Sequence, residues 1–252
     1  MSPAPSSFTF EPLFLALVVV AAALYARAAR AKRPPAWRIT LFSLGLLLIA
    51  GALNSPLETI AANYLLLFHL LQNVMIADWA PPLLILGLTP AMRACVARAG
   101  GRPFAVLTRP GIALPVWLVG WYAIHLALFY DFALEQSWTL NIEHLLLIAI
   151  GIIFWWPVLA DEPVDIGPPV KIGYLGAAFV GATFLGLGLT FASTPFYDFY
   201  ADAPRLWGIS AERDQNFGGI LMNVEQAFVF LAAILYFVWK LVPDEGHTRA
   251  GA

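Results

Sequence analysis

Charged side chains are scarce in this sequence. Asp, Glu, Lys and Arg make up 12% of its 252 residues, whereas hydrophobic residues make up 60%. A soluble domain carries about 25% charged and about 45–50% apolar residues, so the composition disfavours a water-soluble enzyme and a disordered chain. The formal net charge is -2 with 14 basic residues. Because this balance supplies no general basic surface, we expect no nucleic-acid partner.

Cysteine and the common nucleotide or zinc motifs are also missing. The single cysteine, Cys95, cannot form an internal disulfide or a CxxC pair. The sequence has no GxxxxGK[ST] phosphate loop, no GxGxxG fingerprint after a strand and no HExxH zinc motif. No arrangement of nucleophile and base can be identified either, so we expect that the chain is not an enzyme.

Long apolar runs are what the sequence contains instead. A membrane-spanning helix needs about 20 mostly apolar residues. Seven runs suit this purpose, at residues 10–25, 39–52, 60–88, 112–129, 142–159, 172–191 and 217–242. We therefore predict an all-α polytopic membrane protein, with residues 1–252 forming one domain of seven transmembrane helices. Pro81 and Pro82 remove two backbone donors from the third run, so that helix should kink or break there.

The basic residues predict how these helices are oriented. Loops on the cytoplasmic side of a membrane carry an excess of Lys and Arg. Seven spans place twelve basic residues on one side and only Arg205 and Arg213 on the other. The twelve are Arg27, Arg30, Lys32, Arg33, Arg38, Arg93, Arg98, Arg102, Arg109, Lys171, Lys240 and Arg249. This asymmetry predicts an outer N-terminus and a cytoplasmic C-terminus in a bacterial plasma membrane.

Three of the four histidines are predicted to share one depth, toward the outer face. With alternating span directions, His69, His125 and His144 all fall in the outer part of their helices, whereas His247 falls in the cytoplasmic tail. Ionisable residues inside spans are costly and are functional candidates by default. Imidazole is a common ligand of copper, zinc and iron, and the Met222 thioether would add a preference for Cu(I).

Several other polar residues fall near the histidine trio. Glu143 and Asp214 lie at a similar depth and could orient imidazole N–H groups as outer acceptors. Asn73 lies one turn below His69, and Asp78 lies deeper still. The trio could equally make ordinary interhelical hydrogen bonds, since a single intramembrane histidine does so more often than it binds a metal. We predict that the three histidines form a shared polar site.

Four sequence stretches, in order, resemble one family. The stretch HLLQNVMIADWAPPLLILGLTP from His69 is similar to the family's HMxQHMxL…APPLLxLGxP signature. WYAIHLALFYD from Trp121 is similar to its WxxHLPxLYD pattern. EHL from Glu143, followed by FWWPV, looks like its EHL…FWxPV element. DQNFGGILM from Asp214 looks like its DQxxGGLIM element. Together they resemble the CtaG-type assembly factors of caa-type cytochrome c oxidases.

The resemblance implies a seven-helix plasma-membrane protein that delivers copper to cytochrome c oxidase. Its expected partners are oxidase subunits and membrane lipid. The site residues that it implies are His69, His125, His144, Asp214 and Met222. Two positions depart from the family pattern. Asn73 stands where the family has a second histidine, and Asn223 stands where it tends to have tryptophan. Because an amide oxygen is a poor ligand for Cu(I), Asn73 puts the ligand set in doubt.

Three alternatives stay open at this point. A metal-free scaffold for the oxidase would leave the oxidase's copper content intact in a His125→Ala variant. A metal transporter would need a polar path across the whole membrane, of which Asn73 and Asp78 offer a part. A haem-handling protein would use two of the histidines as axial ligands and would show a Soret band.

Overall fold

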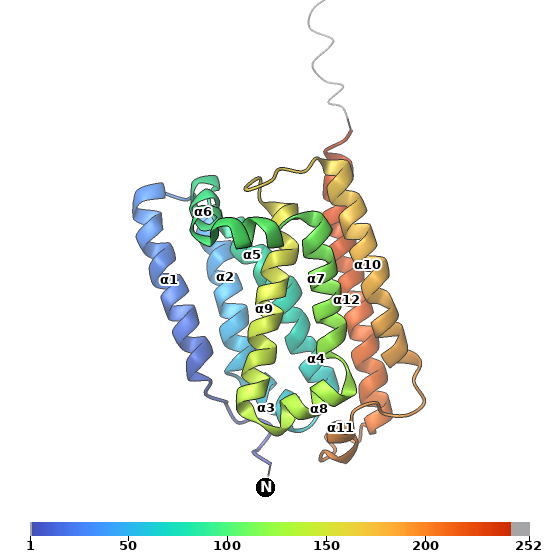
Figure 1. Cartoon of the computed structure of the whole chain (residues 1–252). Coiled ribbons are helices and arrows are strands. Elements are labelled where there is room, and N and C mark those ends of the chain that lie inside the picture. Colours follow the sequence, from blue (N-terminus) through green and yellow to red (C-terminus); the bar gives the residue numbers. More distant parts are fainter. Residues whose placement is uncertain (1, 243–252) are drawn as a thin grey trace, which may run out of the picture.

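In a computed structural model the chain folds as a bundle of helices, and the structure describes residues 2–242 (Figure 1). Arg249 and His247 therefore lie outside the described residues. Every regular element within residues 2–242 is helical, which confirms the predicted all-α class. In chain order the elements are α1 (Pro12–Lys32), α2 (Ala36–Leu53), α3 (Pro56–Asn63), α4 (Leu66–Val74), the π-helix η1 (Met75–Trp79), α5 (Ala80–Gly87), α6 (Pro90–Leu107), α7 (Pro110–Ile124), α8 (Ala127–Glu135), α9 (Ser137–Leu159), α10 (Pro168–Phe191), α11 (Asp198–Asp202) and α12 (Ala211–Trp239).

Six of the described helical stretches are long and apolar enough to cross a membrane. They are α1, α2, the continuous α4–η1–α5 stretch, α9, α10 and α12. The predicted total of seven is reached when α6 and α7, which meet at an angle of 76°, count as one broken span. Figure 1 shows α7 running along α9 and α10, whereas α6 turns across one end of the bundle.

Two predicted spans are divided in the structure, whereas the other five differ from it only in where they begin or end. The run at 60–88 does not form one helix, because Ile60 belongs to α3 and the extended backbone of Leu65 separates α3 from α4. The run at 112–129 also divides, since α7 ends at Ile124 and Phe129 lies in the separate helix α8. Short apolar helices at the end of a bundle carry the same hydrophobicity as a span, so composition alone does not reveal the reversal of the chain.

The structure also shows where the helix is irregular near Pro81 and Pro82, the position at which a kink or break was expected. The irregularity is a π-helical turn over Met75–Trp79, just before Pro81 and Pro82, and not a gap at the prolines themselves. Both prolines then fall in the first turn of α5. Their missing N–H groups matter least at that position, because the first N–H groups of a helix have no intrahelical acceptor. The helix thus continues through Gly87 as one candidate span.

Two helical stretches form the centre of the bundle. More than half of the α4–η1–α5 and α9 spans is buried, at 61% and 56%, whereas only 6% of α1 is buried. Between these two central helices, Gly151 of α9 lies directly against η1 and α5. A Cβ added at Gly151 would collide with the Ala77 carbonyl oxygen and lie 2.9 Å from Pro81 Cγ. The missing side chain lets the two backbones approach closely.

Adding one methyl group at this contact should destabilise the fold. We expect Gly151→Ala to lower the free energy of unfolding by about 1–3 kcal/mol, because α9 must move away from η1. Thermal unfolding of the purified protein in detergent measures the effect. Gly173→Ala is the matched control, since a Cβ at Gly173 of α10 meets nothing within 4 Å. Equal melting temperatures for the two variants would contradict the close contact.

Candidate functional site

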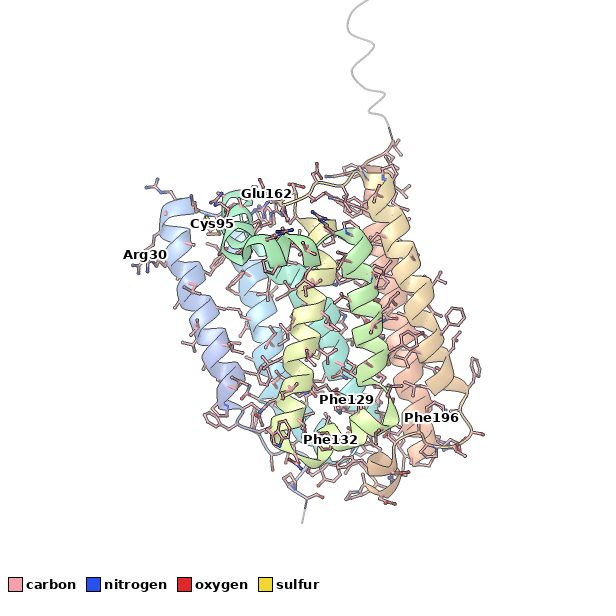
Figure 2. The ribbon with its side chains drawn as sticks, viewed as in Figure 1. Arg30, Cys95, Phe129, Phe132, Glu162 and Phe196 are labelled. Carbon is pink, nitrogen blue, oxygen red and sulfur yellow. The ribbon has the colours of Figure 1, made fainter. Side chains whose placement is uncertain are left out.

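The three predicted histidines meet at one end of the bundle. His69 lies in the first half of α4, His144 lies in the first half of α9, and His125 caps the C-terminus of α7. All three side chains are buried. Figure 1 shows these helix ends on the side of the N-terminus, and Figure 2 places Arg30 and Cys95 at the opposite end. The shared depth predicted for the trio is therefore present in the structure.

Hydrogen bonds determine which nitrogen of His69 carries a proton. The Tyr200 hydroxyl donates to the Ala61 carbonyl oxygen over 2.6 Å. Its oxygen therefore accepts from Nδ1–H of His69, at 2.8 Å. The lone pair of His69 Nε2 is left facing Glu143 Oε1 at 3.3 Å. Both of these atoms are acceptors when His69 is neutral and Glu143 is ionised, so a cation placed between them would be held by both.

His125 offers a second nitrogen with a free lone pair. Its Nδ1 lies 2.7 Å from the Trp121 carbonyl oxygen, which can only accept, so Nδ1 carries the proton. Nε2 of His125 has no hydrogen-bond partner among residues 2–242. The ring of Tyr130 in α8 lies beside both histidines, with centroid distances of 4.8 Å to His69 and 5.8 Å to His125. The Tyr130 hydroxyl is likewise without a partner in that part of the chain.

The third histidine, His144, follows Glu143 on α9. Neither of its ring nitrogens has a hydrogen-bond partner within the described part of the chain. Its ring lies 6.0 Å from that of His69 and 5.8 Å from that of Phe14, both in edge-on geometry. Buried polar atoms normally find partners, so a group of unpartnered imidazole nitrogens requires a functional or structural explanation.

Asn73, which stands where the resembled family has a histidine, lies fully buried beside Glu143. Its Nδ2 donates to Glu143 Oε1 over 3.3 Å. The same carboxylate oxygen faces His69, so Asn73 and His69 converge on it from adjacent turns of α4. Asn73 therefore acts as a donor to Glu143. The hydrogen bond gives this position a role that needs no metal ligand.

The remaining predicted site residues lie elsewhere in the bundle. Asp214 at the start of α12 accepts the backbone N–H groups of Leu66 and Leu67, at 2.8 and 2.9 Å. It thus caps α4, whose own N-cap residue supplies no side-chain acceptor. Met222 is buried in the main apolar cluster. Asp78 is buried in η1, with no hydrogen-bond partner for either carboxylate oxygen among the residues described.

The described residues contain no group of three or more His, Cys, Asp or Glu side chains arranged to hold a metal ion. The predicted ligand set of His69, His125, His144 and Met222 therefore stays a prediction. The structure brings the three histidines to one region, with the Tyr130 ring next to two of them.

Sequence reasoning missed the tyrosines and Glu58. Tyr130 and Tyr200 come from two short helices, α8 and α11, that composition does not distinguish from loops or spans. The adjacency of Tyr130 to Asp131 in the second family-like motif was a signal that could have found Tyr130. Glu58 of α3 is buried and accepts from Nε2 of Gln72, one helix away. Burial raises the pKa of Glu58 from 4.5 to about 7.

The Asp214 cap gives a prediction that is independent of metal. Asp214→Ala leaves two buried N–H groups of α4 without acceptors, so we expect a loss of about 1–3 kcal/mol in the free energy of unfolding. The loss should be the same in copper-loaded and copper-free protein, as measured by thermal unfolding in detergent. Glu212→Ala, an exposed carboxylate in the same turn of α12, is the control and should have little effect. A loss confined to copper-loaded protein would contradict the capping role.

Glu58 should make stability depend on pH. Its raised pKa means that the folded state binds the proton more tightly than the unfolded chain does. The stabilisation is complete below about pH 4.5 and is lost as the pH rises through about 7. At pH 8, Glu58→Gln should therefore be more stable than the original chain, by up to about 3 kcal/mol. Unfolding at pH 5 and pH 8 measures this difference, and an equal difference at both values would contradict it.

The whole chain can now be compared with known proteins. Residues 18–243 match the sequence profile of the family described as cytochrome c oxidase caa3 assembly factor. A Mycobacterium leprae (strain TN) protein described as uncharacterized is 24% identical over 173 residues, which are 61% of this chain. The chain spans only 26% of that relative's length. No solved structure matches. Because the profile covers nearly all of its length, the chain belongs to the caa3-type cytochrome c oxidase assembly factor family.

Proposed function

We propose that this protein assists assembly of a cytochrome c oxidase in a bacterial plasma membrane by holding a copper ion and releasing it to the oxidase. Membership of the family supports the assembly role. Six to seven candidate spans support a membrane location. The copper is cargo in this proposal, so the site must bind it reversibly and is not expected to form a closed cage of four ligands.

The unpartnered imidazole nitrogens are the observation that carries the copper proposal. Nε2 of His125 and both nitrogens of His144 are buried and have no hydrogen-bond partner within residues 2–242, and Nε2 of His69 faces Glu143 Oε1 at 3.3 Å. Leaving such atoms unpaired costs free energy unless a ligand compensates for it. Neutral imidazole is a good ligand for copper. The donor chemistry of the site therefore fits this cargo.

His69 and His144 are the pair best suited to start binding. Their ring centroids lie 6.0 Å apart. Imidazoles that share an ion place each nitrogen about 2.0–2.1 Å from it, which corresponds to centroids roughly 5–6.5 Å apart. Glu143, adjacent to His144, would balance the charge of the ion. His125 and Met222 stay as further proposed ligands.

The position of the site supports delivery at one face of the membrane. The trio lies at the bundle end opposite Arg30 and Cys95 (Figure 2). Because basic residues gather at cytoplasmic ends, we propose that the histidine end faces outward.

A scaffold that binds no metal is the second candidate function. It is favoured by the lack, among the described residues, of any three-residue cluster arranged for a metal. Asn73 also completes a hydrogen bond to Glu143 without a metal. In this alternative the polar cluster fixes the packing of α4, α9 and the short outer helices, and the oxidase is assembled through contacts alone.

Metal analysis of purified protein separates the two functions. After copper loading and desalting, we expect near-stoichiometric copper in the original chain and at least a fivefold loss in both His125→Ala and His144→Ala. His247→Ala is the control, because His247 belongs to the C-terminal tail. Mass spectrometry of the metal content provides the measurement, and circular dichroism verifies that each variant is helical. Absence of copper from folded original protein would reject the copper role in favour of the scaffold.

A further inference from the structure

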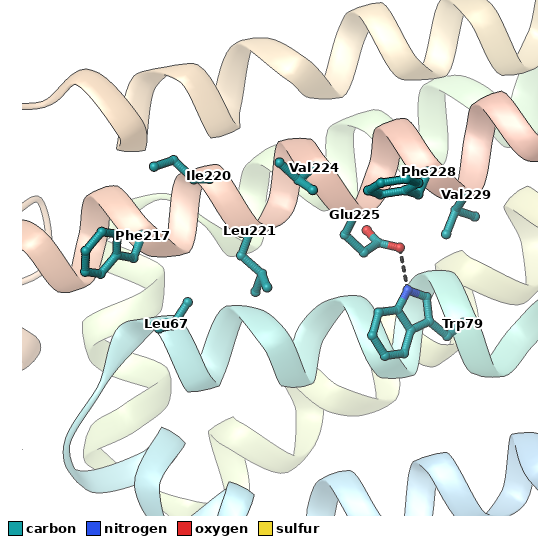
Figure 3. Close-up of a pocket in the computed structure, with 9 residues that line it drawn as sticks. All are labelled: Leu67, Trp79, Phe217, Ile220, Leu221, Val224, Glu225, Phe228 and Val229. Carbon is teal, nitrogen blue, oxygen red and sulfur yellow. Dashed lines mark hydrogen bonds between the residues drawn. The ribbon is translucent and has the colours of Figure 1, made fainter.

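A groove runs along the bundle between α12 and the α4–η1 segment, with a volume of about 520 Å³ (Figure 3). Its walls are apolar. Phe217, Ile220, Val224 and Phe228 contribute from α12, and Leu67 contributes from α4. The four α12 side chains are 45–74% exposed. Such a surface would ordinarily face lipid tails, which need no specific contact.

One carboxyl group interrupts this apolar surface. Glu225 lies at the midpoint of α12 (Ala211–Trp239) and is only 7% exposed. Its Oε1 accepts from Trp79 Nε1 over 2.5 Å, across the groove (Figure 3). Its Oε2 has no hydrogen-bond partner among residues 2–242. An unpartnered carboxyl oxygen at the middle of a membrane span is costly and is a functional candidate by default.

A second carboxyl group lies behind the first. Asp78 precedes Trp79 in η1, is fully buried, and lies close enough to Glu225 for their charges to interact. Neither carboxylate oxygen of Asp78 has a hydrogen bond of ordinary geometry in the described part of the chain, and the polar side chains that face it, Trp155 and Gln226, are uncharged. Neither carboxyl group takes part in the ion pairs found among those residues. The groove therefore combines apolar walls with acidic groups that lack a basic partner.

The chain has no basic residue of its own to place at this depth. All 14 Lys and Arg residues fall outside the central parts of the apolar runs, and the three buried histidines lie at one end of the bundle. A second copy of this chain therefore cannot supply the cation. Lipid tails cannot supply it either, because they carry no hydrogen-bond donor. A different transmembrane helix can fill the groove and donate to Glu225 at once.

We propose that this groove docks a transmembrane helix of an oxidase subunit that carries a basic side chain at mid-membrane depth, donating to Glu225. The proposal rests on the oxidase-assembly function and adds the surface that meets the oxidase. Apolar side chains of the incoming helix would pack against Val224 and Phe228. The carboxyl group would select the depth and rotation of that helix, as polar contacts between helices do in membranes.

Photo-crosslinking in native membranes tests this docking site. A benzophenone amino acid replaces Phe228 in the groove, and the same replacement at Phe184 of α10, which is 65% exposed outside the groove, is the control. In cells that produce epitope-tagged oxidase subunits, we expect a crosslink to an oxidase subunit from position 228 and none from position 184. Adding Glu225→Leu should lower the yield at least fivefold. Adding Glu225→Gln, which keeps the shape without the charge, should lower it at least threefold.

Other outcomes would overturn the proposal. Crosslinks from position 228 only to lipid, only to a second copy of the chain, or equal to those from position 184 would reject the oxidase helix as the occupant. An unchanged yield in Glu225→Gln would reject the basic side chain. Melting temperature and protein level verify that each variant folds. The copper content of the oxidase is measured in the same membranes, so that a loss of the copper role in His125→Ala can be separated from a loss of docking.

Discussion

Every polar group inside a bilayer must find its partner within the protein, and this constraint organises the whole bundle. The central helix shows it at both ends. Asp214 from α12 accepts the first free N–H groups of α4. At the other end, Arg38 from α2 donates to the carbonyl oxygens of Leu86 and Leu88, at 2.6 and 2.5 Å. Side chains from distant parts of the sequence thus pair with the free backbone groups at both ends of the helical stretch that carries the candidate site.

Several buried polar atoms of the described residues are exceptions to this constraint, and two groups of them contain ionisable side chains. One is the histidine end, where imidazole nitrogens and the Tyr130 hydroxyl lack partners among the residues described. The other is the middle of α12 and the adjacent η1, where Glu225 and Asp78 form no ion pair with any residue that the structure describes. Because unpaired buried groups are expensive, their gathering marks the two regions where a ligand or partner protein would stabilise the structure. We propose a metal cargo for the first region and a helix with a basic side chain for the second.

The two regions lie on the same continuous stretch, α4–η1–α5. His69 and Asn73 belong to α4, and Asp78 and Trp79 belong to η1. The π-helical turn directs consecutive residues differently from a regular α-helix, and such turns often occur at functional sites. Here Asp78 is buried toward the core, while Trp79 lines the lipid-facing groove. The proposed docking of the oxidase and the proposed holding of copper would therefore act on one structural element.

Much of the candidate site could be predicted from the sequence. Alternating span directions predicted a shared depth for His69, His125 and His144, and the structure places them at one end of the bundle. The roles of Asn73 and Asp214 could not be predicted from the sequence. Asn73 is a donor to Glu143, and Asp214 caps α4. A cap provided by a residue 148 positions away has no local signature.

The sequence by itself determined that the chain is an all-α membrane protein, because apolar runs of spanning length can satisfy their backbone groups in lipid only as helices here. It also determined which polar residues enter the membrane. The tertiary structure alone decided which of them meet. It divided two apolar runs into spans and short end helices and set the Tyr130 ring beside two histidines. It also left Glu225 Oε2 without a hydrogen-bond partner among residues 2–242. Those outcomes depend on packing between helices far apart in the chain, whereas hydrophobicity is a local property of each segment.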